Sequence, residues 1–194
     1  MLKYLSFIVF LLFSKLVFAE ENFYIVALGN YLKPDKNTKS FDGFGSGLAI
    51  GKELNSHVNI ELHGFWQNYN NDYSCCKNVK VDLDGESLLT GATVDIEWFF
   101  KRSDFSPYLV SAFGGMNTNY KMQAIIPEKT IYYEKNTSSF IFEAGIGENY
   151  SLTNNLSLRA DIRYRLNTFP SVVNDKSNNL FNDLVVNFGL STPF

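Results

Sequence analysis

The stretch LSLRADIRYR, residues 156–165, decides the fold, because its side chains alternate strictly between two kinds. The apolar positions are Leu156, Leu158, Ala160, Ile162 and Tyr164. The polar positions are Ser157, Arg159, Asp161, Arg163 and Arg165. A repeat of two residues is the period of a β-strand, whose successive side chains point to opposite faces of the sheet. The stretch therefore predicts a strand with one apolar face and one face that carries three arginines and an aspartate.

Seven further stretches of the chain read as strands. With the first stretch, the eight predicted strands are residues 23–31, 43–54, 58–66, 88–100, 107–118, 140 onward, 156–165 and 184–194. A membrane β-strand needs about 9–11 residues, and strands of this kind are long enough. No segment shows the apolar repeat of about 3.6 residues that marks a helix. The chain after its leader is therefore expected to be all-β.

The predicted connections alternate in length along the chain. The long ones are residues 32–42, 68–86, 119–137 and 167–179, and the short ones are residues 55–56, 101–106 and 151–154. This alternation is typical of an up-and-down barrel with tight turns at one end and long loops at the other. The sequence therefore predicts an eight-stranded antiparallel up-and-down transmembrane β-barrel that forms one domain, residues 20–194.

The first nineteen residues, MLKYLSFIVFLLFSKLVFA, read as an export signal. Lys3 precedes a short apolar run, and Val17 and Ala19 suit a cleavage site after Ala19. A membrane anchor is the alternative interpretation. The run is shorter than the ~20 residues that a spanning helix needs, and Lys15 interrupts it. We expect residues 1–19 to be removed as a signal peptide.

Alternation alone does not say which face of the barrel points inward. A soluble lipocalin-like barrel buries its apolar face around a ligand, whereas a membrane barrel turns that face to lipid. The lysines after the leader fall in predicted connections or at strand ends, whereas the charges within strands are acids and arginines that can pair. The predicted ion-pair network of the lumen is Glu61, Asp95, Glu97, Glu143, Arg159, Asp161, Arg163 and Arg165.

Aromatic residues gather near the ends of the predicted strands. They are Trp66, Trp98, Phe99, Phe100, Tyr108, Tyr150 and Phe194. Such rings suit the membrane interface, where one part of a side chain is dry and another is wet. The alternative is that they are ordinary core aromatics. We expect interface positions, above all for Trp66, Trp98, Tyr108, Tyr150 and Phe194.

The turn between residues 150 and 156 predicts a register. If these two residues pair, Glu143 lies opposite Arg163 on the polar side, with the Cβ atoms roughly 5 Å apart. This predicts an enclosed ion pair with Asp161 and Arg159 nearby. Such a pair either forms a gate for ions or simply fills the lumen, since an eight-stranded barrel is barely wide enough for its own side chains.

Three segments resemble a known family. The ending LVVNFGLSTPF resembles the C-terminal strand that the barrel assembly machinery of bacteria recognises in outer-membrane proteins. The segments YSLTNNLSLRADIRYR and GFGSGLAIGKELNSHVNIEL resemble hairpins of the small eight-stranded outer-membrane β-barrel family, a porin family that includes the OmpA membrane domain and OmpX. The resemblance implies the outer membrane of a Gram-negative bacterium, contact with outer-membrane lipids and lipopolysaccharide, and termini in the periplasm.

The resemblance and the polar loops favour a non-enzymatic protein of envelope integrity, with loops that bind an external or host ligand. A narrow porin-like channel or a conduit for small molecules is the alternative, and a lipid A-modifying enzyme is a third hypothesis. One deacylase family carries a His-x-Ser motif in a late strand, where this chain reads RYRLN, and neither His57 nor His63 has a serine at a revealing spacing.

No cofactor or metal site is expected. Without Lys3 and Lys15 the chain has 15 basic residues against 20 acidic ones and no basic stripe, which speaks against nucleic-acid binding. Glycines at alternate strand positions are interpreted as gaps for neighbouring side chains. The adjacent Cys75 and Cys76 are either two free thiols or a labile or intermolecular disulfide.

Overall fold

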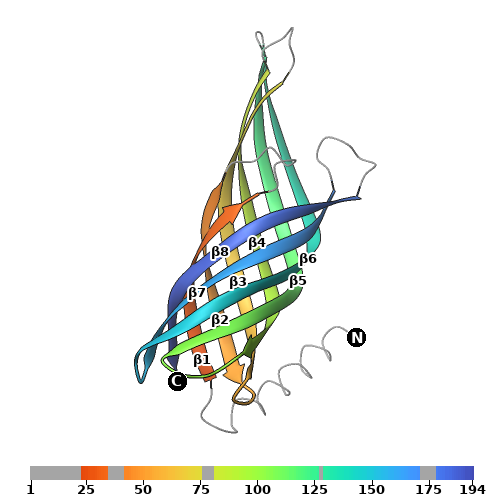
Figure 1. Cartoon of the computed structure of the whole chain (residues 1–194). Helices are drawn as coiled ribbons and strands as arrows, with labels where there is room; N and C mark the ends of the chain where they lie inside the picture. Colours follow the sequence, from red (N-terminus) through yellow and green to blue (C-terminus); the bar gives the residue numbers. More distant parts are fainter. Residues whose placement is uncertain (1–22, 35–41, 76–80, 127–128, 171–177) are drawn as a thin grey trace, which may run out of the picture.

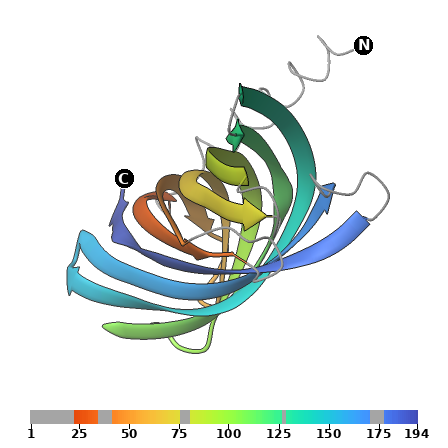
Figure 2. The ribbon, with the colours of Figure 1, turned by 90° about the horizontal axis from the view of Figure 1, so that it is seen from above.

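A computed structural model describes residues 23–34, 42–75, 81–126, 129–170 and 178–194. These residues form eight strands: β1 Phe23–Lys33, β2 Gly43–Glu53, β3 Val58–Cys75, β4 Val81–Phe99, β5 Phe105–Ile126, β6 Lys129–Thr153, β7 Leu156–Pro170 and β8 Asn178–Pro193. Each strand pairs antiparallel with the next, and β8 pairs with β1 to close a barrel. From above, β1 lies beside β8 (Figure 2). The predicted fold class is confirmed.

Some sequence-based expectations fall on residues that the structure does not describe. The predicted signal peptide, residues 1–19, lies outside the described part of the chain, and so do Cys76 and the side chain of Cys75. None of the described residues belongs to a helix that is long and apolar enough to cross a membrane.

The strands β3 to β6 extend far into segments that were expected to be loops. β3 pairs with β4 as far as Cys75 opposite Val81, and β5 pairs with β6 as far as Ile126 opposite Lys129. The expected loops at residues 68–86 and 119–137 are therefore mostly β-hairpins. The strand pairing continues through both segments. Figure 1 shows them projecting at the end opposite the C-terminus.

The barrel turns its apolar positions outward. In β7 the side chain of Ile162 is 50% exposed, whereas that of its neighbour Arg163 is fully buried. The same holds in β8, where Phe188 and Leu190 are exposed and Asn187 is buried. An outward apolar face and an enclosed polar face are the arrangement of a membrane barrel.

Two glycines make room for inward-pointing tyrosine rings. A Cβ atom added to Gly147 would lie 2.3 Å from Cζ of Tyr108, and one added to Gly51 would lie 2.3 Å from Cζ of Tyr24. Both distances are far below van der Waals contact, so each ring rests directly on the backbone of the glycine. The interpretation of strand glycines as gaps is confirmed at these positions.

The predicted register of the β6–β7 hairpin is wrong by two residues. Tyr150 pairs with Leu158, and Glu143 therefore lies opposite Arg165 instead of Arg163. The turn is tighter than expected, because the strands continue to Thr153 and from Leu156, with a register irregularity between Ser151 and Thr153. Only two asparagines remain for the turn, a residue type that tolerates tight turns well.

A buried ionic network inside the barrel

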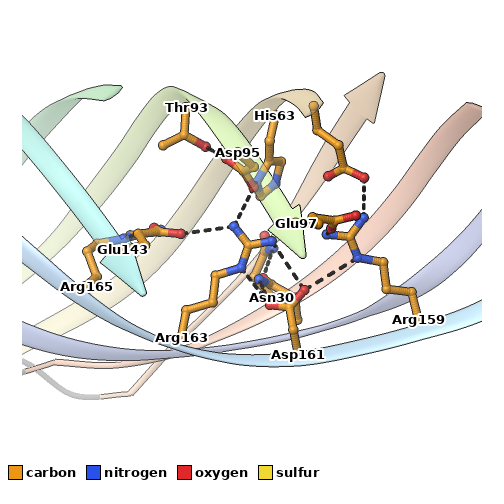
Figure 3. A network of polar contacts seen from close by, with 12 residues as sticks. Asn30, His63, Thr93, Asp95, Glu97, Glu143, Arg159, Asp161, Arg163 and Arg165 are labelled. Carbon is orange, nitrogen blue, oxygen red and sulfur yellow. Dashed lines mark hydrogen bonds and ion pairs between the residues drawn. The ribbon is translucent and has the colours of Figure 1, made fainter. Parts of the chain in front are cut away.

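The centre of the barrel holds a network of charged side chains. Every second residue of β7 between positions 159 and 165 points inward, which places three arginines and Asp161 in the lumen. The facing carboxylates are Glu61 from β3, Asp95 and Glu97 from β4, and Glu143 from β6. All eight residues predicted for the lumen are thus buried, and ion pairs join them (Figure 3).

Arg163 is the hub of this network. Its Nη1 atom lies 2.5 Å from Oδ2 of Asp95 and 3.2 Å from Oε2 of Glu143, and its Nε atom lies 2.7 Å from Oδ1 of Asp161. The enclosed Arg163–Glu143 pair therefore exists although the register that suggested it is wrong. Long side chains bring the two groups together from positions that are not directly opposite.

Arg159 ties opposite walls of the barrel together. It forms ion pairs with Glu61 and Glu97, and its Nε atom donates a hydrogen bond to the hydroxyl of Tyr108 at 2.8 Å. β3, which carries Glu61, lies four strands away from β7 in the ring of eight, so this contact spans the lumen.

Arg165 forms the part of the network nearest to the projecting hairpins. Its Nε atom donates to Oε1 of Glu143 at 2.6 Å, and its Nη1 atom donates to Oε1 of Gln67 at 2.9 Å. The guanidinium also lies over the ring of Phe65, 4.6 Å from its centroid, which is a cation–π contact. Arg165 thus joins the ionic network to a buried apolar cluster that contains Phe65.

Asparagine, threonine and histidine side chains outside the predicted set complete the network. The Nδ2 atom of Asn187 donates to Oδ1 of Asp161, and that of Asn30 donates to Oδ1 of Asn187, both at 2.7 Å. The hydroxyl of Thr93 donates to Asp95 at 2.5 Å, and Nδ1 of His63 lies 3.6 Å from the same carboxylate. These residues occupy inward positions of their strands, so face assignment could have found them where a search for charges could not.

Tyr108 is not at the membrane interface, which corrects its predicted position. Its side chain is 1% exposed, and its hydroxyl donates to Oδ2 of Asp161 at 3.1 Å. Phe99, which was also expected at the interface, packs against it with ring centroids 5.0 Å apart. Both lie near strand ends, but on inward positions, and the position along the strand does not decide the face. The neighbour Leu109 points outward.

The remaining aromatic residues predicted for the interface are exposed on the outside of the barrel. They are Trp66, Trp98, Phe100, Tyr150 and Phe194. Trp98 is 54% exposed, and its ring lies near that of His57 in the neighbouring turn. All five lie near the rims of the apolar outer face. We therefore still predict that these side chains lie at the membrane interface.

The two histidines lie apart and in different surroundings. His57 contacts the hydroxyl of Ser56 through its Nδ1 atom at 2.8 Å, but both residues are exposed in the turn between β2 and β3. His63 points into the lumen beside Asp95. A nucleophilic serine needs a base that a third group orients, and neither histidine is placed in such a set by the contacts of the described residues.

Comparisons with known proteins point to one family. The model of the outer membrane protein beta-barrel domain family matches residues 5–194. The fold is similar to a major outer membrane protein from Thermus thermophilus, with a TM-score of 0.58, 14% identity, and coverage of 91% of this chain and 100% of that chain. It is also similar to the attachment invasion locus protein Ail of Yersinia pestis, with a TM-score of 0.55, 13% identity, and coverage of 90% and 100%.

A third similar structure is that of Neisserial surface protein A, with a TM-score of 0.50, 19% identity, and coverage of 89% of this chain and 97% of that chain. No curated protein sequence matches the chain. Identities of this size show a shared fold alone.

Proposed function

Because the chain belongs to the outer membrane protein beta-barrel domain family, we propose that it is a non-enzymatic protein of the outer membrane. In this proposal the barrel supports envelope integrity, and its projecting hairpins contact external or host partners. The observation that carries this proposal is the filled lumen. Arg163 and Arg165 are among the largest fully buried side chains of the described residues, and their ion pairs cross the space that a channel would need.

The proposed orientation follows from the two unequal ends of the barrel. The short turns and the C-terminus lie at one end, and the projecting hairpins lie at the other (Figure 1). We place the short turns and both termini in the periplasm, after removal of residues 1–19, and the hairpins outside the cell. The outward apolar face then contacts outer-membrane lipids and lipopolysaccharide, and the strand that ends at Phe194 is the one that the barrel assembly machinery recognises.

The surface proposed for external partners is the outer part of the β5–β6 hairpin. β6 pairs with β7 only from Ile141 onward among the described residues, so the preceding part of β6 rises beyond β7. Ile131 and Tyr132 are exposed there. Exposed apolar and aromatic side chains are common in protein contact surfaces. Ail was crystallised with sucrose octasulfate, a heparin analogue, which makes this compound a suitable first probe for the hairpins.

A deletion strain tests the function directly. Loss of the gene is expected to raise leakage of the outer membrane and to reduce attachment to host surfaces. A copy in which the β5–β6 hairpin is shortened to end at the barrel rim should restore the barrier but not attachment. Full attachment by the shortened protein contradicts the surface role, and an unchanged barrier in the deletion strain contradicts the envelope role.

Two further measurements separate the alternatives. In planar bilayers the purified protein is expected to give no reproducible conductance, whereas conductance that changes when Glu143 is replaced would favour a channel. Expression is expected to leave the mass of lipid A unchanged, whereas a mass shift would reveal an enzyme.

A further inference from the structure

A polar cavity opens at the short-turn end of the barrel, on the side opposite the projecting hairpins. Its volume is about 280 Å³. Glu97 and Arg159 form its floor, which is also the end of the ionic network, and Glu53 and Arg102 lie at its mouth. The rest of the wall comes from serines, asparagines, aromatic residues and Pro193. The role proposed above for the outer hairpins does not involve this cavity.

One wall of the cavity carries a row of three serines. Ser151 of β6 pairs with Ser157 of β7, and Ser157 pairs with Ser191 of β8. Adjacent strands lie about 4.8 Å apart, so the three hydroxyl groups form a row with a spacing of about 5 Å. Among the described residues, none forms a hydrogen bond with the side chain of any of these serines. The row therefore offers three free donors and acceptors to a molecule in the cavity.

A buried amide oxygen extends this row. Oδ1 of Asn149 is out of contact with solvent and has no hydrogen-bond partner among the described residues. Asn149 lines the same cavity and lies opposite Arg159 in the β6–β7 pairing. This position is deeper in the barrel, closer to the ionic network, than the pair of Ser151 and Ser157. A buried polar atom without a partner costs free energy, and rotation of the amide toward the cavity would let a bound donor remove that cost.

Aromatic rings also line the cavity. Tyr24 and Tyr108 point into the lumen from β1 and β5, and Phe99 packs against Tyr108 at the end of β4. Phe23 lies at the rim. Aromatic rings of this kind offer flat apolar surfaces beside the hydrogen-bonding groups, which is the usual mixture in sites for small molecules.

The charged groups of the cavity are already paired with one another. Nη1 of Arg102 lies 2.9 Å from Oε1 of Glu53, and Arg159 forms an ion pair with Glu97. Each charged group of the cavity wall therefore already has an opposite partner, and none is left unpaired to attract an ion. The groups that remain free are neutral hydroxyls and amides.

We infer that this cavity binds a neutral polyhydroxylated molecule about the size of one sugar ring. The hydroxyl groups of the ligand bind the serine row and Asn149, and its C–H face lies against the aromatic rings. The volume of about 280 Å³ lies just below the range for ligand sites, about 300–1,000 Å³, which excludes long oligosaccharides from full enclosure.

The test is a titration of the refolded full barrel in detergent micelles, followed by the backbone amide signals in NMR spectra. The probes are glucose and N-acetylglucosamine, with acetate and sulfate as ionic controls. Binding at millimolar concentrations is expected to shift the signals of residues 149–159 and 189–193. Ser157→Ala is expected to weaken binding about fivefold, as the loss of one hydrogen bond does. The matched control is Ser111→Ala, because Ser111 is exposed on the outer face of β5.

The outcomes separate clearly. The site is supported if a sugar shifts these signals and if its binding is weakened by Ser157→Ala and by Ser151→Ala but not by Ser111→Ala. The proposal is overturned if neither sugar shifts these signals at tens of millimolar, if the shifts fall on the outer hairpins, or if acetate and sulfate shift the same signals equally. The heat-dependent change in electrophoretic mobility shows that each variant is folded, so loss of binding is not loss of the barrel.

Discussion

Replacing Arg163 by methionine tests the claim that the ionic network holds the barrel together. Methionine keeps most of the apolar stem and removes the guanidinium, which leaves the carboxylates of Asp95, Asp161 and Glu143 without their shared partner. All of these groups are at most 2% exposed, so water cannot take the place of the arginine.

The expected magnitude follows from these contacts. At an effective dielectric constant of about 20, two unit charges about 4 Å apart attract by about 4 kcal/mol, so three contacts give about 12 kcal/mol of gross attraction. The desolvation of the charges offsets much of this, and removal of one partner from a buried pair typically costs about 3–5 kcal/mol. We expect Arg163→Met to lower the free energy of unfolding by about 3–5 kcal/mol.

The assay is equilibrium unfolding in urea of the protein reconstituted in lipid vesicles, followed by tryptophan fluorescence. Glu53→Gln is the matched control, because it removes only the charge of the Arg102–Glu53 pair, which is partly open to solvent, with side chains 26% and 42% exposed. Pairs of this kind contribute about 1 kcal/mol or less. A loss for Arg163→Met no larger than that for Glu53→Gln would show that the ionic network does not hold the barrel together.

Three further predictions concern the same lumen. Gly147→Ala should destabilise the barrel by about 1–3 kcal/mol, since the new Cβ atom meets the ring of Tyr108 at 2.3 Å, whereas Gly64→Ala, with its nearest atom at 3.9 Å, should cost less in the same urea titration. Tyr108→Phe removes two hydrogen bonds and should cost about 1–3 kcal/mol, and an unchanged midpoint would show that the hydroxyl does not matter. A double-mutant cycle of Arg163→Met and Glu143→Gln should give a coupling of at least about 0.5 kcal/mol, and additive effects would reject the pair.

The sequence predicted the barrel because two independent patterns agree. The alternation in residues 156–165 requires a strand with two different faces, and the lengths of the connections require an up-and-down order of strands. Arginine and carboxylate residues within the strands predicted that the polar face points inward. The burial of Arg159 and Arg163 beside exposed Ile162 agrees with this prediction.

The errors have identifiable physical causes. The hairpins beyond the rim carry only short alternations, such as VKVDLD at residues 79–84 and YKMQAI at residues 120–125, and these stand among polar residues that favoured loops. The β6–β7 register depends on an irregularity near Ser151 that a count of residues does not reveal. Tyr108 was assigned by its nearness to a strand end, although its inward position and the gap left by Gly147 decide where the ring goes.

The sequence pattern also could not predict which charged groups of the network pair with one another. Alternation identifies which side chains share the lumen, but a contact such as Arg159–Glu61 joins strands that are far apart in the chain and opposite in the ring. Three arginines and five carboxylates allow several pairings, and the tilt and stagger of the strands select among them.

Oxygen and nickel-complex accessibility of spin labels tests whether the apolar face meets lipid while the polar face is enclosed. After Cys75 and Cys76 are replaced by serine, one label is placed at Ile162→Cys and one at Ser157→Cys, and both proteins are reconstituted in vesicles. High contact with oxygen and low contact with the nickel complex are expected at position 162, and the reverse at position 157, which lines the open cavity. A label at position 162 that contacts the nickel complex more than oxygen would show that this face meets water and that the barrel does not turn it to lipid.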